Sequence, residues 1–162
     1  MKPMDTAYDG LREKVKGRNI NEQTLLATDY LNHFNEVIML IEMVPDMPEC
    51  LEDVQDWQPK SYPDHFRDSS FSDKDLAIEA YEHAPERYRE PFDATVDKAN
   101  RLVRVTIERL EKAIEHEDPD ALPHITAAAC AALKTLLDQA SAIIHGSETT
   151  MDQSEIDGLL SD

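Results

Sequence analysis

Histidines and carboxylates are the residues of this chain that could ligate a metal ion. The chain has 6 histidines and 34 acidic residues, and a helical bundle can hold a di-iron centre through Glu-x-x-His pairs on facing helices. That spacing is absent, because the residues three positions before the histidines are Tyr30, Tyr62, Ala80, Ala113, Ala121 and Ala142. The reverse order occurs in His33 with Glu36 and in His83 with Glu86, where ordinary pairs on a helix surface explain it equally well. We therefore expect no metal and no other cofactor.

Nucleophilic chemistry has little support in the residue pattern. A phosphotransfer domain would present an exposed histidine close to a lysine and small residues; His124 precedes an alanine-rich stretch, but Lys134 lies too far along to match. Cys50 and Cys130 form no CxxC pair, so we expect them to be buried, reduced thiols. An oxyanion site usually needs glycine-rich turns, and this sequence has none. We assign no catalytic residue.

The net charge argues against two classes of partner. The formal charge is −18, from 34 acidic and 16 basic residues, and such a surface repels nucleic acid and anionic membranes. The N-terminal residues lack the apolar core of a signal peptide, and we see no run of the ~20 apolar residues that span a bilayer. We expect a cytoplasmic protein that binds no nucleic acid and does not insert into a membrane.

Apolar residues recur every three or four positions along most of the chain, which predicts helices. Asn21 is a plausible N-cap for the first helix and Pro45 ends it, while Ser72 with Asp75 resembles a capping box for another. Residues 58–70 contain two prolines and are predicted to be a loop. The prediction is four main helices and a short extra one, over residues 21–44, 72–84, 92–117 and 119–145, with the short helix at 48–57.

Together these helices predict an all-α fold, an antiparallel helical bundle. Asp118 and Pro119 leave room for only a tight turn between the last two helices, so these helices should form a hairpin. The alanine-rich run at residues 127–132 lets a neighbouring helix or a second subunit approach closely, which keeps a homo-oligomer open. Six side chains on the apolar stripes should share one core: Phe34, Ile41, Val103, Leu110, Leu133 and Leu136.

The remaining segments set the predicted domain organisation. Residues 1–20 are polar and are expected to be a mobile arm or a short frayed helix. Residues 21–146 form the bundle domain, and residues 147–150 are a polar linker. Residues 151–162 are an acidic, amphipathic tail, which should be mobile in the free protein and bind a partner.

The tail has the most informative pattern. Asp152 and Glu155 have capping-box spacing, and Ile156, Leu159 and Leu160 share one face of one to two helical turns. A segment this short is not a stable helix alone and would fold on a partner. Because it carries acids and no base, that partner should offer an apolar groove with Lys or Arg at the rim.

Six tail residues match a peptide known from bacterial chemotaxis: Gln153, Glu155, Ile156, Asp157, Leu159 and Leu160. They resemble the Ser-Gln-x-Glu-Ile-Asp-x-Leu-Leu peptide at the N-terminus of the flagellar switch protein FliM, and a related acidic peptide ends the chemotaxis phosphatase CheZ. The resemblance implies that these residues bind the receiver domain of a CheY-like response regulator. Asp152 stands where the family has serine, and Gly158 weakens the helix.

Three functions follow as hypotheses. The leading one is a non-catalytic adaptor of chemotaxis or two-component signalling, with the tail recruiting a receiver domain. The second is an auxiliary phosphatase: the Asp-x-x-x-Gln pair of CheZ is absent, but CheX-like phosphatases use an acid and an Asn three positions later, a spacing found in Asp29 with Asn32 and Asp97 with Asn100. The third is a bundle that binds a small ligand or metal, with an incidental tail.

Overall fold

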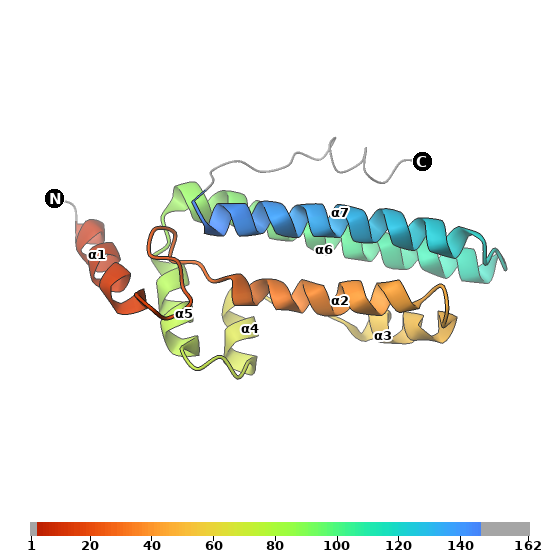
Figure 1. Cartoon of the computed structure of the whole chain (residues 1–162), viewed down its shortest axis with the longest axis horizontal. Coiled ribbons are helices and arrows are strands. Elements are labelled where there is room, and N and C mark those ends of the chain that lie inside the picture. The colour runs from red at the N-terminus through yellow and green to blue at the C-terminus, as the bar shows by residue number, and fades with distance from the viewer. Residues whose placement is uncertain (1–2, 147–162) are drawn as a thin grey trace. The chain divides into compact units, whose positions relative to one another are not determined.

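The computed structural model describes residues 3–146, and over this range the chain is helical without a strand (Figure 1). The predicted all-α class is therefore confirmed. The linker and tail predicted at residues 147–162 lie outside the described residues. The helices are α1 (Pro3–Val15), α2 (Asn32–Met43), α3 (Leu51–Asp56), α4 (Tyr62–Asp68), α5 (Lys74–Glu82), α6 (Glu86–Glu115) and α7 (Ala121–Ile144), with 3-10 turns at Thr28–Leu31 and Pro48–Cys50.

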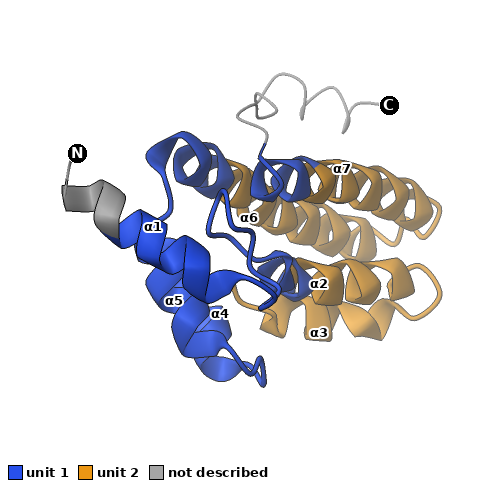
Figure 2. Cartoon of the chain, turned by 60° about the vertical axis from the view of Figure 1, so that its left-hand side comes forward, with its two compact units in different colours: residues 1–33, 60–94, 139–150 blue, residues 34–59, 95–138, 151–162 orange. Residues whose placement is uncertain are grey.

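The chain divides into two compact units, which Figure 2 shows in different colours. The described part of unit 1 comprises residues 3–33, 60–94 and 139–146, and that of unit 2 comprises residues 34–59 and 95–138. Helices α2, α6 and α7 each contribute residues to both units. The single bundle domain expected over residues 21–146 stays a prediction.

Unit 2 holds the predicted aliphatic core. In it α6 and α7 lie side by side and run antiparallel, joined through residues 116–120 (Figures 1 and 2). Lys134 Nζ on α7 lies 3.1 Å from Glu42 Oε1 on α2. The six core residues predicted from the stripes are all at most 2% exposed, namely Phe34, Ile41, Val103, Leu110, Leu133 and Leu136. The stripe assignment is confirmed.

The first predicted helix was too long. Residues 21–27 are not helical, and α2 begins only at Asn32 after a 3-10 turn. The Asn21 side chain accepts hydrogen bonds from the backbone N–H groups of Gln23 and Thr24, at 2.8 and 2.9 Å, and so closes a local turn. Leu25 has a φ of 61°, a left-handed conformation that ends any helical run. Asn21 therefore stabilises a loop and does not cap α2.

Residues 58–70 were wrongly predicted to be a loop throughout, because they contain helix α4. Ser61 caps this helix by accepting a hydrogen bond from Asp64 N at 3.2 Å, and Pro63 occupies the first turn, where proline is tolerated. Tyr62 and Phe66 are 4% and 0% exposed. Both side chains therefore belong to the core of unit 1.

Further helix starts differ from the prediction. Helix α7 begins at Ala121, two residues after the predicted start at 119. Helix α6 begins at Glu86, so Pro91 lies inside it. The side chains of Tyr88 and Phe92, on either side of that proline in the sequence, are buried. Helix α5 begins at Lys74 after Asp73, which makes no side-chain cap, so the Ser72–Asp75 box does not start it. Burial of apolar side chains offsets the missing hydrogen bond at Pro91.

The N-terminal segment and the last helix complete the description. Residues 3–15 form α1, and Leu11 and Val15 are 3% and 0% exposed, so the frayed-helix alternative is nearer to the structure than a mobile arm. Helix α7 ends at Ile144, two residues before the predicted stop at Gly146, which has a φ of 114°. Among residues 3–146 only α7 is long and apolar enough to cross a membrane by length and composition, and 50% of the tested window is buried. A core helix of a folded domain passes the same test.

Candidate functional site

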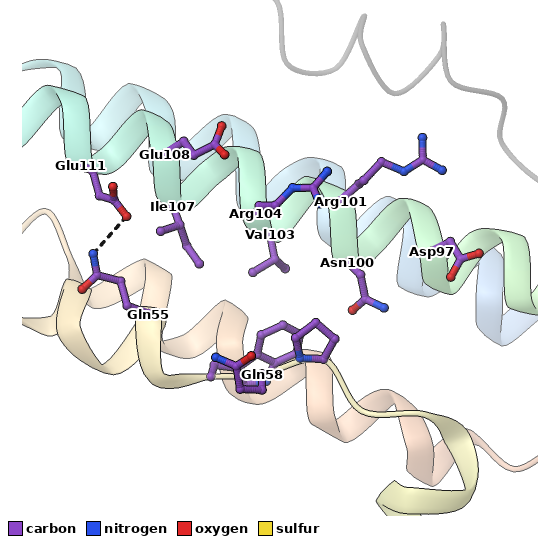
Figure 3. A pocket seen from close by; sticks show the side chains of 12 residues that line it. Gln55, Gln58, Asp97, Asn100, Arg101, Val103, Arg104, Ile107, Glu108 and Glu111 are labelled. Atoms are coloured by element: carbon purple, nitrogen blue, oxygen red, sulfur yellow. Dashed lines mark hydrogen bonds between the residues drawn. The ribbon is translucent and has the colours of Figure 1, made fainter.

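A groove of about 650 Å³ runs along α6 in unit 2 (Figure 3). One wall is formed by the end of α3 and the residues after it: Gln55, Trp57, Gln58 and Pro59. The other wall is one side of α6, with Asp97, Asn100, Arg101, Val103, Arg104, Ile107, Glu108 and Glu111. A residue every three or four positions on α6 faces the same side, so a continuous strip of that helix is available to a ligand.

The lining combines an apolar floor with amide groups. Figure 3 shows Asn100, Val103 and Ile107 directed toward the segment that contains Gln58. Gln55 Nε2 donates to Glu111 Oε1 at 3.1 Å and closes one end. An amide side chain both donates and accepts hydrogen bonds, and charged side chains of both signs, among them Arg104 and Glu108, also line the groove.

The Asp97 and Asn100 pair lies in this groove. Asp97 is exposed, whereas Asn100 Oδ1 is buried and accepts no hydrogen bond from the described residues. A buried acceptor without a donor costs about 1–3 kcal/mol, and a donor on a bound molecule or a water would remove that cost. Of the two predicted acid and amide pairs, this one lines a groove and contains a buried acceptor with no donor among the described residues.

The Asp29 and Asn32 pair has a different environment, in unit 1. Asn32 Nδ2 donates to Asp29 Oδ1 at 3.3 Å, and Asp29 Oδ2 lies 3.0 Å from His65 Nε2 on α4. Both carboxylate oxygens are thus already used. Asp29 links the 3-10 turn at Thr28–Leu31 to α4, which is a structural role.

The predicted histidine pairs do not come together as a metal site. His33 is 8% exposed and its ring centroid lies 6.3 Å from that of His65 in unit 1. His83 and Glu86 both border a hollow in unit 1. Within residues 3–146, no three His, Cys, Asp or Glu side chains are grouped so that they could hold one metal ion.

The remaining nucleophile candidates also have clear positions. His124 is exposed and borders a hollow of unit 2 with Arg109 and Asp118. Cys50 and Cys130 are both free and buried, as predicted. Burial, reinforced by Glu42, raises the pKa of the Cys130 thiol to about 11. It therefore stays protonated near neutral pH and is a poor nucleophile.

The site residues predicted from the sequence and the groove in the structure overlap only in part. The six tail residues Gln153, Glu155, Ile156, Asp157, Leu159 and Leu160 lie outside the described residues. The groove wall at Gln55 and Gln58 was not predicted. Its signal was a pair of glutamines flanking the buried Trp57, but only the position of α6 makes that pair part of a groove.

Comparison with models of protein families, with curated proteins and with solved structures finds no match to this chain. Over residues 3–146 the structure therefore defines only a class: an all-α protein with a groove of mixed polar and apolar lining along α6.

Proposed function

We propose that this protein is a non-catalytic adaptor of bacterial chemotaxis or two-component signalling, which binds a response-regulator receiver domain through its C-terminal peptide. The observation that carries the proposal is the run of six matching tail residues, Gln153, Glu155, Ile156, Asp157, Leu159 and Leu160. The antiparallel bundle serves as the scaffold. In the sequence the peptide follows helix α7, which ends at Ile144.

The binding energy comes from the apolar face of the peptide. Ile156, Leu159 and Leu160 enter a groove on the receiver, and each buried side chain contributes roughly 1.5–3 kcal/mol. Asp152 and Asp157 lie at the rim of that contact. Rim charges mainly steer the encounter, so they act on the association rate and its salt dependence.

The experiment is titration of the full chain against chemotaxis receiver domains, with and without a phosphoryl mimic. Replacing Ile156 and Leu160 together with Ala should weaken binding on the order of a hundredfold. The control replaces Val105 and Ile114 with Ala, since both are 37% exposed in unit 2, and it should leave affinity unchanged. Equal binding by the wild type and the tail variant, or no binding to any receiver, contradicts the proposal.

A second candidate function is dephosphorylation of the receiver by Asp97 and Asn100. It is favoured by the position of both residues in the groove of α6 and by the unpaired Asn100 Oδ1. In this reaction Asn100 orients a water whose oxygen attacks the phosphorus of the aspartyl phosphate. The bond from phosphorus to the aspartate oxygen breaks, the carboxylate is restored, and inorganic phosphate leaves with the protons of the water.

Phosphate release from a phosphorylated receiver separates the two functions. The adaptor leaves the spontaneous rate unchanged, whereas the phosphatase accelerates it and loses that effect in Asn100→Ala. The matched control is Asn32→Ala, because Asn32 has the same spacing from an acid but bonds to Asp29. Equal loss in both variants would contradict a role for the groove.

A further inference from the structure

Three methionines on the surface of unit 2 are exposed far more than apolar residues usually are. The exposed fractions of Met39, Met43 and Met47 are 65%, 44% and 45%. Met39 and Met43 are four positions apart on α2 and therefore share a face. Met47 N donates to Met43 O at 2.9 Å, so the row continues past the end of the helix. We call these three residues the methionine row.

The methionine row has no part in the core of unit 2. Helix α2 packs through other residues, and Phe34, Val37 and Ile41 are all 0% exposed. Contiguous apolar side chains left on a surface mark interaction sites more often than isolated ones do. Methionine is also unbranched and polarisable, so it adapts to the shape of an apolar partner.

The surroundings of the methionine row are acidic. No Lys or Arg occurs between Arg18 and Lys60. The unit 2 segment 34–59 carries 7 acids, all exposed: Glu36, Glu42, Asp46, Glu49, Glu52, Asp53 and Asp56. The first four lie within three positions of a methionine of the row. One basic residue of α7, Lys134, reaches these acids: its Nζ lies 3.1 Å from Glu42 Oε1.

An apolar row surrounded by acids favours a partner that carries positive charge. Two copies joined through the same face would place carboxylates against carboxylates, which costs free energy. A helix with an apolar stripe and flanking Lys or Arg covers the sulfur-containing side chains and pairs with the acids. Anionic membrane surfaces are repelled by the same carboxylates.

We propose that the methionine row, with Glu36, Asp46 and Glu49 at its edge, is the docking surface for a basic amphipathic helix of a partner protein. The surface lies in unit 2 and does not include the C-terminal peptide. It therefore supplies a second contact, independent of receiver binding.

The test uses the full chain and a synthetic helical peptide of leucine and lysine, with the leucines on one face. The comparison peptide has the same composition with the leucines spread around the helix, so its net charge is identical. The amphipathic peptide should bind the more tightly, by roughly tenfold or more, because only it offers a continuous apolar stripe.

Protein variants assign the binding to the row. Met39→Gln with Met43→Gln should lower the affinity for the amphipathic peptide roughly tenfold or more, because less apolar surface is buried at these two positions when the peptide binds. The matched control is Val105→Gln with Ile114→Gln, which changes the other two exposed large apolar residues of the described chain. Circular dichroism melts verify that the wild type and both double variants fold.

A second pair of variants tests the charges. Glu36→Gln with Asp46→Asn should slow association and flatten its salt dependence. Glu115→Gln with Asp120→Asn removes two exposed acids elsewhere in unit 2 and should change neither. Deleting residues 147–162 should leave peptide affinity unaltered, which separates this proposal from the one on receiver binding.

Several results would overturn the proposal. One is equal affinity for the two peptides, and another is an equal effect of the methionine variant and its control. Sedimentation that shows self-association abolished by Met39→Gln with Met43→Gln would assign the row to a second copy. Binding to phosphatidylcholine vesicles that the same variant abolishes would assign it to a lipid surface.

Discussion

The two units of this protein have interiors of different chemistry. Unit 1 contains all five tyrosines, Tyr8, Tyr30, Tyr62, Tyr81 and Tyr88, whereas Phe34 and Trp57 are the only Phe, Tyr or Trp residues of unit 2. In unit 1, the Tyr62 ring packs at a tilt against those of Tyr81 and Phe66, with centroids 4.5 and 4.8 Å apart. The core of unit 2 is mostly aliphatic.

The difference follows from the lengths of the helical segments. The short helices and the irregular segment 16–27 of unit 1 leave many backbone groups without a helical partner. Side chains supply those partners: Tyr62 Oη accepts from Ala27 N at 2.8 Å, and Thr24 Oγ1 donates to Ile144 O at 2.6 Å. Most backbone groups in the long helical segments of unit 2 are paired within the helices themselves, and the core between them is built mostly from aliphatic side chains.

The largest expected effect is in unit 2. Leu133 is 0% exposed, and Leu133→Asp buries an unpaired charge, which costs more than about 4–5 kcal/mol. We expect loss of the cooperative melt, followed by Trp57 fluorescence. Leu133→Met, which conserves volume, is the control. An unshifted melt for the aspartate variant would mean that the stripe assignment is wrong.

The next effect is in unit 1, at alkaline pH. Burial raises the pKa of Tyr62 above its usual value of 10.0, as it does that of Tyr81, where the hydrogen bond to Asp93 adds to it. As the pH rises above 10.0, these tyrosines ionise more readily in the unfolded chain than in the folded one. The free energy of unfolding is therefore unaffected by them below that pH and decreases above it. Tyrosinate absorbance should show both groups titrating late and together with unfolding. Titration of all tyrosines at the usual pH in a folded protein contradicts this.

A smaller effect is expected from Tyr62→Phe. The change leaves the buried N–H of Ala27 without its acceptor, which costs about 1–3 kcal/mol of unfolding free energy in a urea titration. The control is Tyr8→Phe, because the Tyr8 hydroxyl donates to Gln23 O at an exposed position and water replaces it. Equal destabilisation by the two changes would remove the distinction between buried and exposed bonds.

The smallest effect is expected at the groove of unit 2. Gln55→Ala removes an exposed hydrogen bond to Glu111, and surface changes of this kind alter stability by about 0.5 kcal/mol or less. The same urea titration measures it. A decrease in the free energy of unfolding as large as that of Tyr62→Phe would show that unit 2 also depends on side-chain hydrogen bonds.

Local periodicity accounts for what was predicted correctly. The apolar stripe through Val103 and Leu110 and the stop near Gly146 depend on neighbours three or four positions away. The errors arose where a distant residue decides the conformation. Residues 21–27 are held in part by Tyr62, 35 positions from Ala27, and no periodicity in the segment reports that contact.

The candidate site divides in the same way. The sequence by itself determined the helical class, the stripes of unit 2, the spacing of Asp97 and Asn100, and the pattern of the acidic tail, because each is a property of neighbouring residues. Only the tertiary structure decided that Asp29 is bound by His65, that Asn100 lines a groove while its Oδ1 is buried without a donor, and that the methionine row is exposed. These depend on which helix faces which, and that is set by the packing of segments far apart in the chain.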